Sequence, residues 1–175
     1  MKTKTLNKNK LVNEFENIHS NFNKAISQFT EEELNMIPFE GSWTAGQVAE
    51  HIIKSNKGIL NQLLNGREES SDRPFDEHVA LVQEIFRSKE KMKTASRLEP
   101  NKPPHDQDSL LNILKNQKEK QFETIKGKDL NSLIPDLPFP PTPEGLTRYE
   151  WLHLMLEHAD RHRKQIENIY KKLQE

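Results

Sequence analysis

The chain has 175 residues, the length of one domain, and a formal net charge of −1 with acidic and basic residues interspersed. This balance argues against a dedicated nucleic-acid binder, which concentrates basic charge. The lack of cysteine excludes disulfides, thiolate catalysis and thiolate metal sites, and it fits a reducing compartment. The apolar runs are too short for a membrane span. We therefore expect a cytoplasmic protein that binds neither nucleic acid nor membrane.

The first 66 residues predict two long helices with a short helix between them. Along the first, apolar residues recur every three or four positions, at Leu11, Phe15, Ile18, Phe22, Ile26 and Phe29. Thr30, with a glutamate three positions later, forms a capping box that opens the short helix, and Pro38 ends it. Thr44, with a glutamine three positions later, opens the second long helix, which stops at Gly66.

The rest of the chain predicts three more helices, separated by long proline-rich connections. Apolar residues at helical spacing lie within residues 75–86 and 110–125, and Thr147 begins a third capping box before a long last helix. Prolines make residues 94–107 and 135–143 extended connections. Four long helices predict an all-α fold, an up-and-down antiparallel four-helix bundle. We expect a single domain over residues 1–175, with residues 1–8 frayed.

Three histidines stand on the helix faces that are expected to be buried. His158 and His162 are four residues apart on the last helix and leave the same face, in line with its apolar stripe. His51 lies beside the apolar stripe of the helix that Thr44 opens. If these two helices face each other, the three imidazoles converge, as in metal sites built between helices of a bundle. Such ligands suit Zn²⁺, Ni²⁺ or Fe²⁺ and leave a coordination position open for water or substrate.

The alternative interpretation is that no metal is bound, because two histidines four residues apart also occur by chance on polar helices. The other histidines lie outside the proposed cluster and are expected at the surface: His19, His78, His105 and His153. Glu50, Glu157 and Asp160 flank the cluster in sequence, but immediate neighbours on a helix point about 100° away, so we interpret them as solvated charges. Asp160 is a weak candidate for supporting a ligand.

Four further residues are candidates for the surroundings of the site. Gln47 lies one turn before His51 and Gln165 follows His162, so their amides could hydrogen-bond an imidazole or a bound ligand. Trp43 and Trp151 each precede a histidine by about two turns and could wall a pocket. Packing in the core is the simpler role for each tryptophan taken alone.

Two stretches of this sequence resemble a known family. Residues 41–51 (GSWTAGQVAEH), and residues 145–152 (GLTRYEWL) continuing to 158–166 (HADRHRKQI), are similar to the second-helix opening and the ending of DinB-like proteins. This is the DinB/YfiT-like metalloenzyme superfamily, distinct from the polymerase that shares the name. The resemblance implies a four-helix bundle, a divalent metal bound by His51, His158 and His162, and frequent dimers. No family motif aligns with residues 67–106.

The resemblance also implies a class of chemistry. Its members include thiol S-transferases that use bacillithiol or mycothiol, and a mycothiol-dependent isomerase. We therefore expect a metal-dependent enzyme for a small-molecule substrate, either a transferase using a low-molecular-weight thiol or a hydrolase that activates water. The alternative is a non-catalytic metal- or ligand-binding bundle with a structural or sensing role. The long aromatic stripe of the first helix, with Phe15, Phe22 and Phe29, adds to the expectation of a homodimer.

Overall fold

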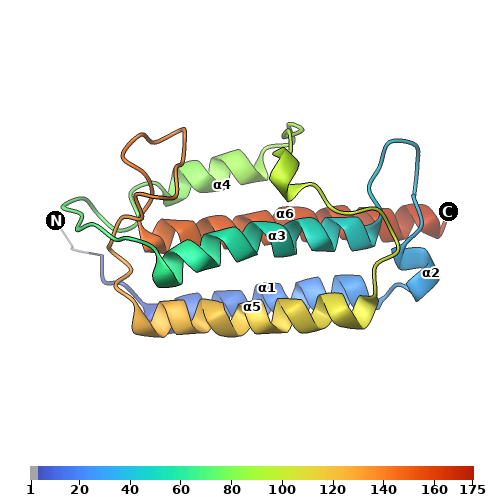
Figure 1. Cartoon of the computed structure of the whole chain (residues 1–175), viewed down its shortest axis with the longest axis horizontal. Coiled ribbons are helices and arrows are strands. Elements are labelled where there is room, and N and C mark those ends of the chain that lie inside the picture. Colours follow the sequence, from blue (N-terminus) through green and yellow to red (C-terminus); the bar gives the residue numbers. More distant parts are fainter. Residues whose placement is uncertain (1–3) are drawn as a thin grey trace.

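The expected all-α class is confirmed by a computed structural model, which describes residues 4–175 (Figure 1). Within these residues there are six α-helices, one 3₁₀ turn and no strand. Their bounds are α1 Lys8–Ser27, α2 Glu31–Leu34, α3 Ala45–Asn65, α4 Val79–Arg87, η1 Ser96–Leu98, α5 Gln107–Gly127 and α6 Arg148–Leu173. Of the expected frayed start, residues 1–3 lie outside the described residues, and α1 already begins at Lys8, capped by Asn7.

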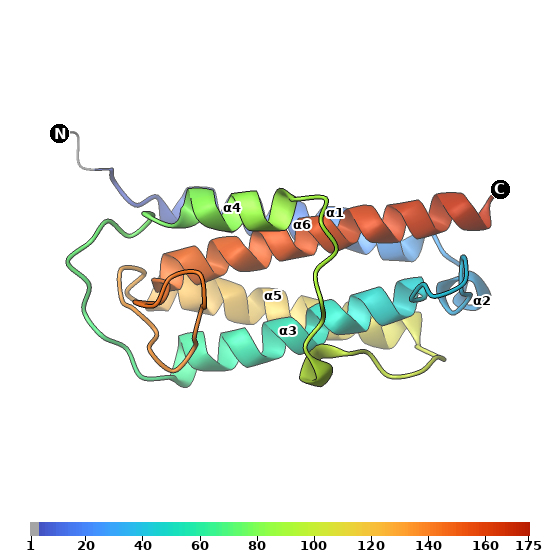
Figure 2. The ribbon, with the colours of Figure 1, turned by 90° about the horizontal axis from the view of Figure 1, so that it is seen from above.

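The four long helices lie side by side and share one interior. α1 packs against α5 and α6, and α3 packs against the same two helices, so that α1 and α3 lie across from each other (Figures 1 and 2). Phe15, Leu63 and Leu152 belong to one group of buried side chains, and Phe22 and Ile52 to a second group further along the helices. Burial of these apolar faces is the main force that holds the helices together.

The expected alternation of helix directions is wrong at one connection. The Gln107 side chain, at the start of α5, donates hydrogen bonds to the Ile26 and Phe29 carbonyls at the end of α1, each at 2.9 Å. Asn35, shortly before α3, donates to the His105 carbonyl at 2.9 Å. α5 therefore begins at the same end as α3 and runs parallel to it, as Figure 1 shows. The parallel course of α3 and α5 requires a connection that spans the length of the bundle, and residues 66–106 are long enough to do so.

This long connection carries α4 and then crosses over α6 and α3. α4 packs on the outer side of α6. At the end of α4 and just after it, the carbonyls of Phe86, Ser88 and Glu90 accept hydrogen bonds from the Arg161 guanidinium of α6. The chain then passes over to η1, beside α3, and on to α5 (Figure 2). We call residues 88–106 the strap.

The three expected capping boxes are confirmed and set where the helices begin. At Thr30, Thr44 and Thr147, the hydroxyl accepts a hydrogen bond from the backbone N–H three residues later, and the Glu or Gln side chain there accepts one from the threonine N–H. These contacts satisfy N–H groups that the first turn leaves without partners. Thr44 fixes the start of α3 and Thr147 that of α6, the two helices that carry the candidate histidines.

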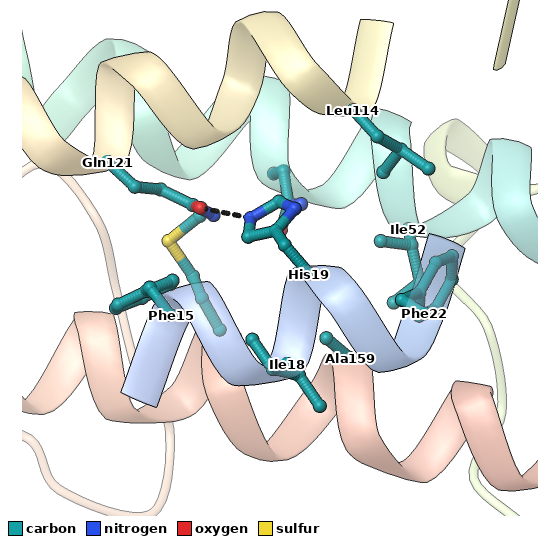
Figure 3. A pocket seen from close by; sticks show the side chains of 10 residues that line it. Phe15, Ile18, His19, Phe22, Ile52, Leu114, Gln121 and Ala159 are labelled. Carbon is teal, nitrogen blue, oxygen red and sulfur yellow. Dashed lines mark hydrogen bonds between the residues drawn. The ribbon is translucent and has the colours of Figure 1, made fainter. Parts of the chain in front are cut away.

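The expectation that His19 and His153 lie at the surface is wrong, since each is only 8% exposed. His19 points between the helices, where its Nε2 is 2.6 Å from Oε1 of Gln121 (Figure 3). His153 is buried as well, although it lies opposite His162 on α6, and its ring centroid is 4.6 Å from that of Tyr149. His78 and His105 are not the solvated histidines expected either, because their side chains are 18% and 8% exposed and pair with Glu144 and Glu50.

The pocket beside His19 is a packing defect of the core. Residues of all four long helices line it, among them Phe22, Ile52, Leu114 and Ala159 (Figure 3). Its volume is about 10 Å³, which is room for about one water molecule. A cavity of this size is too small for a substrate. Among the described residues, each helix is also too polar or too short for a membrane span.

Arg148, at the start of α6, binds the end of α3 and the segments that follow α3 and α5, and we predict that these contacts are important for stability. Its guanidinium is buried and donates to the carbonyls of Leu63 and Asp129 and to the Glu68 carboxylate. Arg148→Met would leave both carbonyls without a donor, so we expect the free energy of unfolding to fall by about 2–4 kcal/mol. Chemical denaturation measures it.

Glu68→Gln is the matched control for this variant. The Glu68 side chain is half exposed, so weakening its ion pair should cost less than about 1 kcal/mol. An equal loss in the two variants would contradict the importance of the buried carbonyl contacts.

Candidate metal centre

His51, in the second turn of α3, meets His158 and His162 of α6, as the sequence predicted. Nε2 of His158 lies 3.2 Å from Nε2 of His51 and 3.1 Å from Nε2 of His162. The three rings stand nearly edge to face, with centroids 4.7 to 5.1 Å apart. Their ligand atoms lie within 4.8 Å of one another, so the group could hold one metal ion.

Hydrogen bonds at the outer side of the His51 and His162 rings determine the tautomer of each ring. They therefore determine whether the nitrogen that faces the centre of the cluster has a free lone pair. Nδ1 of His51 lies 2.9 Å from the Leu98 carbonyl oxygen, and Nδ1 of His162 lies 2.8 Å from Oε1 of Gln165. Both oxygens only accept, so each Nδ1 carries the proton and each neutral ring keeps an unprotonated Nε2. Two lone pairs therefore point toward the Nε2 of His158, an arrangement that a cation at the centre would stabilise.

Burial keeps these imidazoles neutral at pH 7. Loss of hydration is the largest cause that lowers the pKa of all three, to about 4 for His162. For His158, burial holds the pKa well below its ordinary value, and the nearby positive charge of Arg161 lowers it further. The hydrogen bonds to Leu98 and Gln165 oppose these shifts for His51 and His162 but do not cancel them. Neutral imidazole is the form that binds metals.

The donor set fits a divalent transition metal. In a tetrahedral site with metal–nitrogen bonds of about 2.0–2.1 Å, ligand nitrogens stand about 3.3 Å apart, close to the two separations found here. Three neutral nitrogen donors suit zinc, nickel or ferrous iron. Among the described residues the cluster contains three possible ligands and no carboxylate. Three protein ligands leave a position for water or substrate.

Aromatic rings cover two sides of the cluster. The Trp43 ring centroid lies 5.3 Å from that of His51, so Trp43 borders the cluster, a position that the sequence offered only as the alternative to packing in the core. The ring centroid of Phe86, in α4, lies 5.4 Å from that of His158. This contact was not predicted, because nothing in the sequence shows that α4 packs beside His158. Trp151 is not part of the site. It is buried in the core, against Phe139.

The two glutamines have different partners. Gln165 holds His162, as the sequence suggested. Gln47 does not reach a histidine, since its Oε1 accepts from the Thr44 N–H in the capping box and its Nε2 donates to the Asn101 carbonyl in the strap. The capping role of Gln47 fixes its side chain away from the cluster.

The carboxylates that flank the histidines in sequence bind other groups. Glu157 pairs with Arg87 at 2.7 Å, and Asp160 pairs with Arg163 and Lys164 of its own helix. Glu50 is not the solvated charge expected from its position, because it binds the strap through His105 and Asn101. Burial raises the pKa of the Glu50 carboxyl, but hydrogen bonds from these two residues outweigh it, and the pKa falls below its ordinary value.

Comparisons with known proteins agree with this geometry. A family model described as the DinB superfamily matches residues 14–166, a span that includes all three histidines of the cluster. Searches of curated proteins and of solved structures found no match. The match covers most of the chain, and this protein therefore belongs to the DinB superfamily.

Proposed function

We propose that this chain is a metal-dependent enzyme that acts on a small molecule at an ion bound by His51, His158 and His162. The observation that carries the proposal is the convergence of their Nε2 atoms, two of which are kept unprotonated by Leu98 and Gln165. Without a cation, a neutral His158 offers at most one N–H to the two Nε2 lone pairs that face it, so these buried acceptors are not fully satisfied. Membership of the DinB superfamily supports the same site.

The reaction that we propose is transfer of a low-molecular-weight thiol to an electrophile, with hydrolysis as the alternative. A bound divalent ion would lower the pKa of a thiol or a water in its open position. The chain's own residues orient the imidazoles and exclude bulk water. Leu98 and Gln165 hold the rings, and Trp43 and Phe86 supply an apolar lining.

A non-catalytic metal-binding role is the second candidate, favoured by the burial of the cluster. His51 and His158 are 5% and 8% exposed, and the strap contacts His51 directly. A fourth protein ligand would favour this role, since structural sites close their coordination shell. The group of three found among residues 4–175 favours the enzyme instead.

We predict that the untagged protein binds one divalent ion per chain and that a chelator lowers its thermal midpoint at pH 7. A ligand that binds only the folded state stabilises that state. His162→Ala should lose most of this chelator-sensitive stabilisation while α6 stays intact, because alanine favours helix. Elemental analysis and thermal unfolding, with and without chelator, measure these effects. His78→Ala, outside the cluster, should keep the response to chelator.

The pH dependence of the metal-free protein provides a second readout of the same cluster. Unfolded histidines titrate near pH 6.5, whereas the folded cluster titrates lower, down to about 4 for His162. Below about pH 6.5 the unfolded chain therefore binds more protons, and the free energy of unfolding should fall as the pH drops toward 4. His162→Ala should reduce this slope. An unchanged slope, together with no response to chelator in the wild type, would contradict the proposed site.

We predict that the metal-loaded protein accelerates the reaction of a low-molecular-weight thiol with a chromogenic electrophile, and that His162→Ala abolishes the acceleration. The assay screens a panel of thiols, with a chromogenic ester in parallel. Acceleration of ester hydrolysis without any thiol would support the hydrolase. No acceleration of either reaction by the fully metal-loaded protein would favour the non-catalytic role.

We also propose that the protein is cytoplasmic, consistent with its lack of cysteine, and that it is a homodimer. Phe15, Phe22 and Phe29 do not support the dimer, because they are buried within one chain. What supports it is the resemblance to the family and the exposed side chains of Ile37 and Phe39. Sedimentation at about 50 µM should give twice the 20.5 kDa chain mass, and Ile37→Asp should shift it to the monomer. A wild-type monomer would refute the dimer.

A further inference from the structure

The strap reaches the candidate metal centre through one backbone group, the Leu98 carbonyl. This oxygen accepts from Nδ1 of His51 at 2.9 Å, so the position of the strap decides which nitrogen of His51 carries the proton. If the carbonyl moves away, the ring loses the partner that holds its orientation and its tautomer. The element that holds Leu98 in place is therefore part of the support of the site.

Glu50, the residue before His51, is the strongest link between α3 and the strap. Its Oε2 accepts from the Asn101 N–H at 2.6 Å and lies 2.8 Å from Nε2 of His105, and its Oε1 accepts from the Asn101 side chain at 2.8 Å. The carboxylate is mostly buried, at 15% exposure. Charge-assisted hydrogen bonds of this kind are stronger than neutral ones.

Only two residues lie between Leu98 and Asn101 in the chain, so holding Asn101 limits the movement of Leu98. Other side chains of α3 hold the same segment. Lys54 donates to the Glu99 carbonyl at 2.7 Å, and Gln47 donates to the Asn101 carbonyl at 3.2 Å. The contacts continue along one face of α3, from the capping box to the turn after His51.

The start of α3 has room for the strap only because residue 46 is glycine. A Cβ at Gly46 would stand 2.9 Å from Cβ of His105, closer than such atoms approach in proteins. His105 itself is bound to Glu50. A side chain at residue 46 would therefore displace the same part of the strap that Glu50 holds.

We propose that Glu50 is a positioning residue for the metal centre: it fixes the strap at Asn101 and His105, and the strap in turn presents the Leu98 carbonyl to His51. This inference rests on the proposed function, because it assigns Glu50 a role toward the ion that His51 would bind. Asp160 has no such role in this proposal, because its partners Arg163 and Lys164 lie on the same helix as Asp160 and not on the strap.

The test compares Glu50→Gln with Asp160→Asn. Both variants remove one negative charge within two residues of a histidine of the cluster, but only Glu50→Gln weakens the contacts that hold the strap. Zn²⁺ affinity is measured by competition with a chromogenic chelator, and the visible spectrum of the Co²⁺ form reports the coordination geometry. We expect Glu50→Gln to bind Zn²⁺ about 10-fold more weakly, with a changed Co²⁺ spectrum. Asp160→Asn should resemble the wild type in both measurements.

Gly46→Ala is the second variant, and it decides the test if Glu50→Gln does not fold. It leaves every charge in place and should weaken Zn²⁺ binding in the same direction by displacing His105. Zn²⁺ affinity equal to that of the wild type in the folded variants would overturn the inference, and so would an equal loss in Asp160→Asn. A wild-type protein that binds no metal would overturn the proposed function as well, so the two failures are distinguishable.

Discussion

The Nε2 atom of His158 lies 3.2 Å from that of His51 and 3.1 Å from that of His162. The other residues of the candidate site hold the three imidazoles in this arrangement. Removing histidines from water lowers their pKa, so they stay neutral and cannot relieve the crowding by taking up protons at pH 7. With two Nδ1 atoms donating outward, the lone pairs face inward. Such a cluster could hold a metal ion.

Each surrounding element contributes one part of this support. α3 and α6 pack side by side and bring His51 to the pair on α6. α4, on the outer side of α6, places Phe86 beside His158, and Arg161 binds the carbonyls at and after its end. The strap then crosses to α3 and supplies the Leu98 carbonyl (Figure 2). This crossing follows from the parallel course of α3 and α5, because the chain must return along the molecule before α5 begins.

Local patterns explain why part of the site was predictable from the sequence. The capping boxes at Thr44 and Thr147 define the helix starts, and the spacing of His158 and His162 places both on one face. The apolar stripes show which faces are buried, so the meeting with His51 follows once α3 and α6 are neighbours. Gln165 was found in the same way, because its partner His162 is only three residues away.

Features that depend on distant partners could not be predicted. The direction of α5 is set by the path of residues 66–106, which contain no pattern that specifies where they run. The burial of His153, near which Glu14 and Asp76 lie, depends on parts of the chain that are distant in sequence. Glu50 looked like a surface charge because its partners, Asn101 and His105, lie about 50 residues away in an irregular segment. Trp151 occupies the core because its position on α6 faces Phe139.

X-ray absorption spectroscopy of the protein loaded with one equivalent of Zn²⁺ tests the central claim most directly. The account predicts three imidazole nitrogens at about 2.0–2.1 Å from the metal together with one exchangeable light ligand. His51→Ala should reduce the imidazole contribution by one. A spectrum without imidazole scattering, or one unchanged in His51→Ala, would contradict the claim that the three converging histidines form a metal centre.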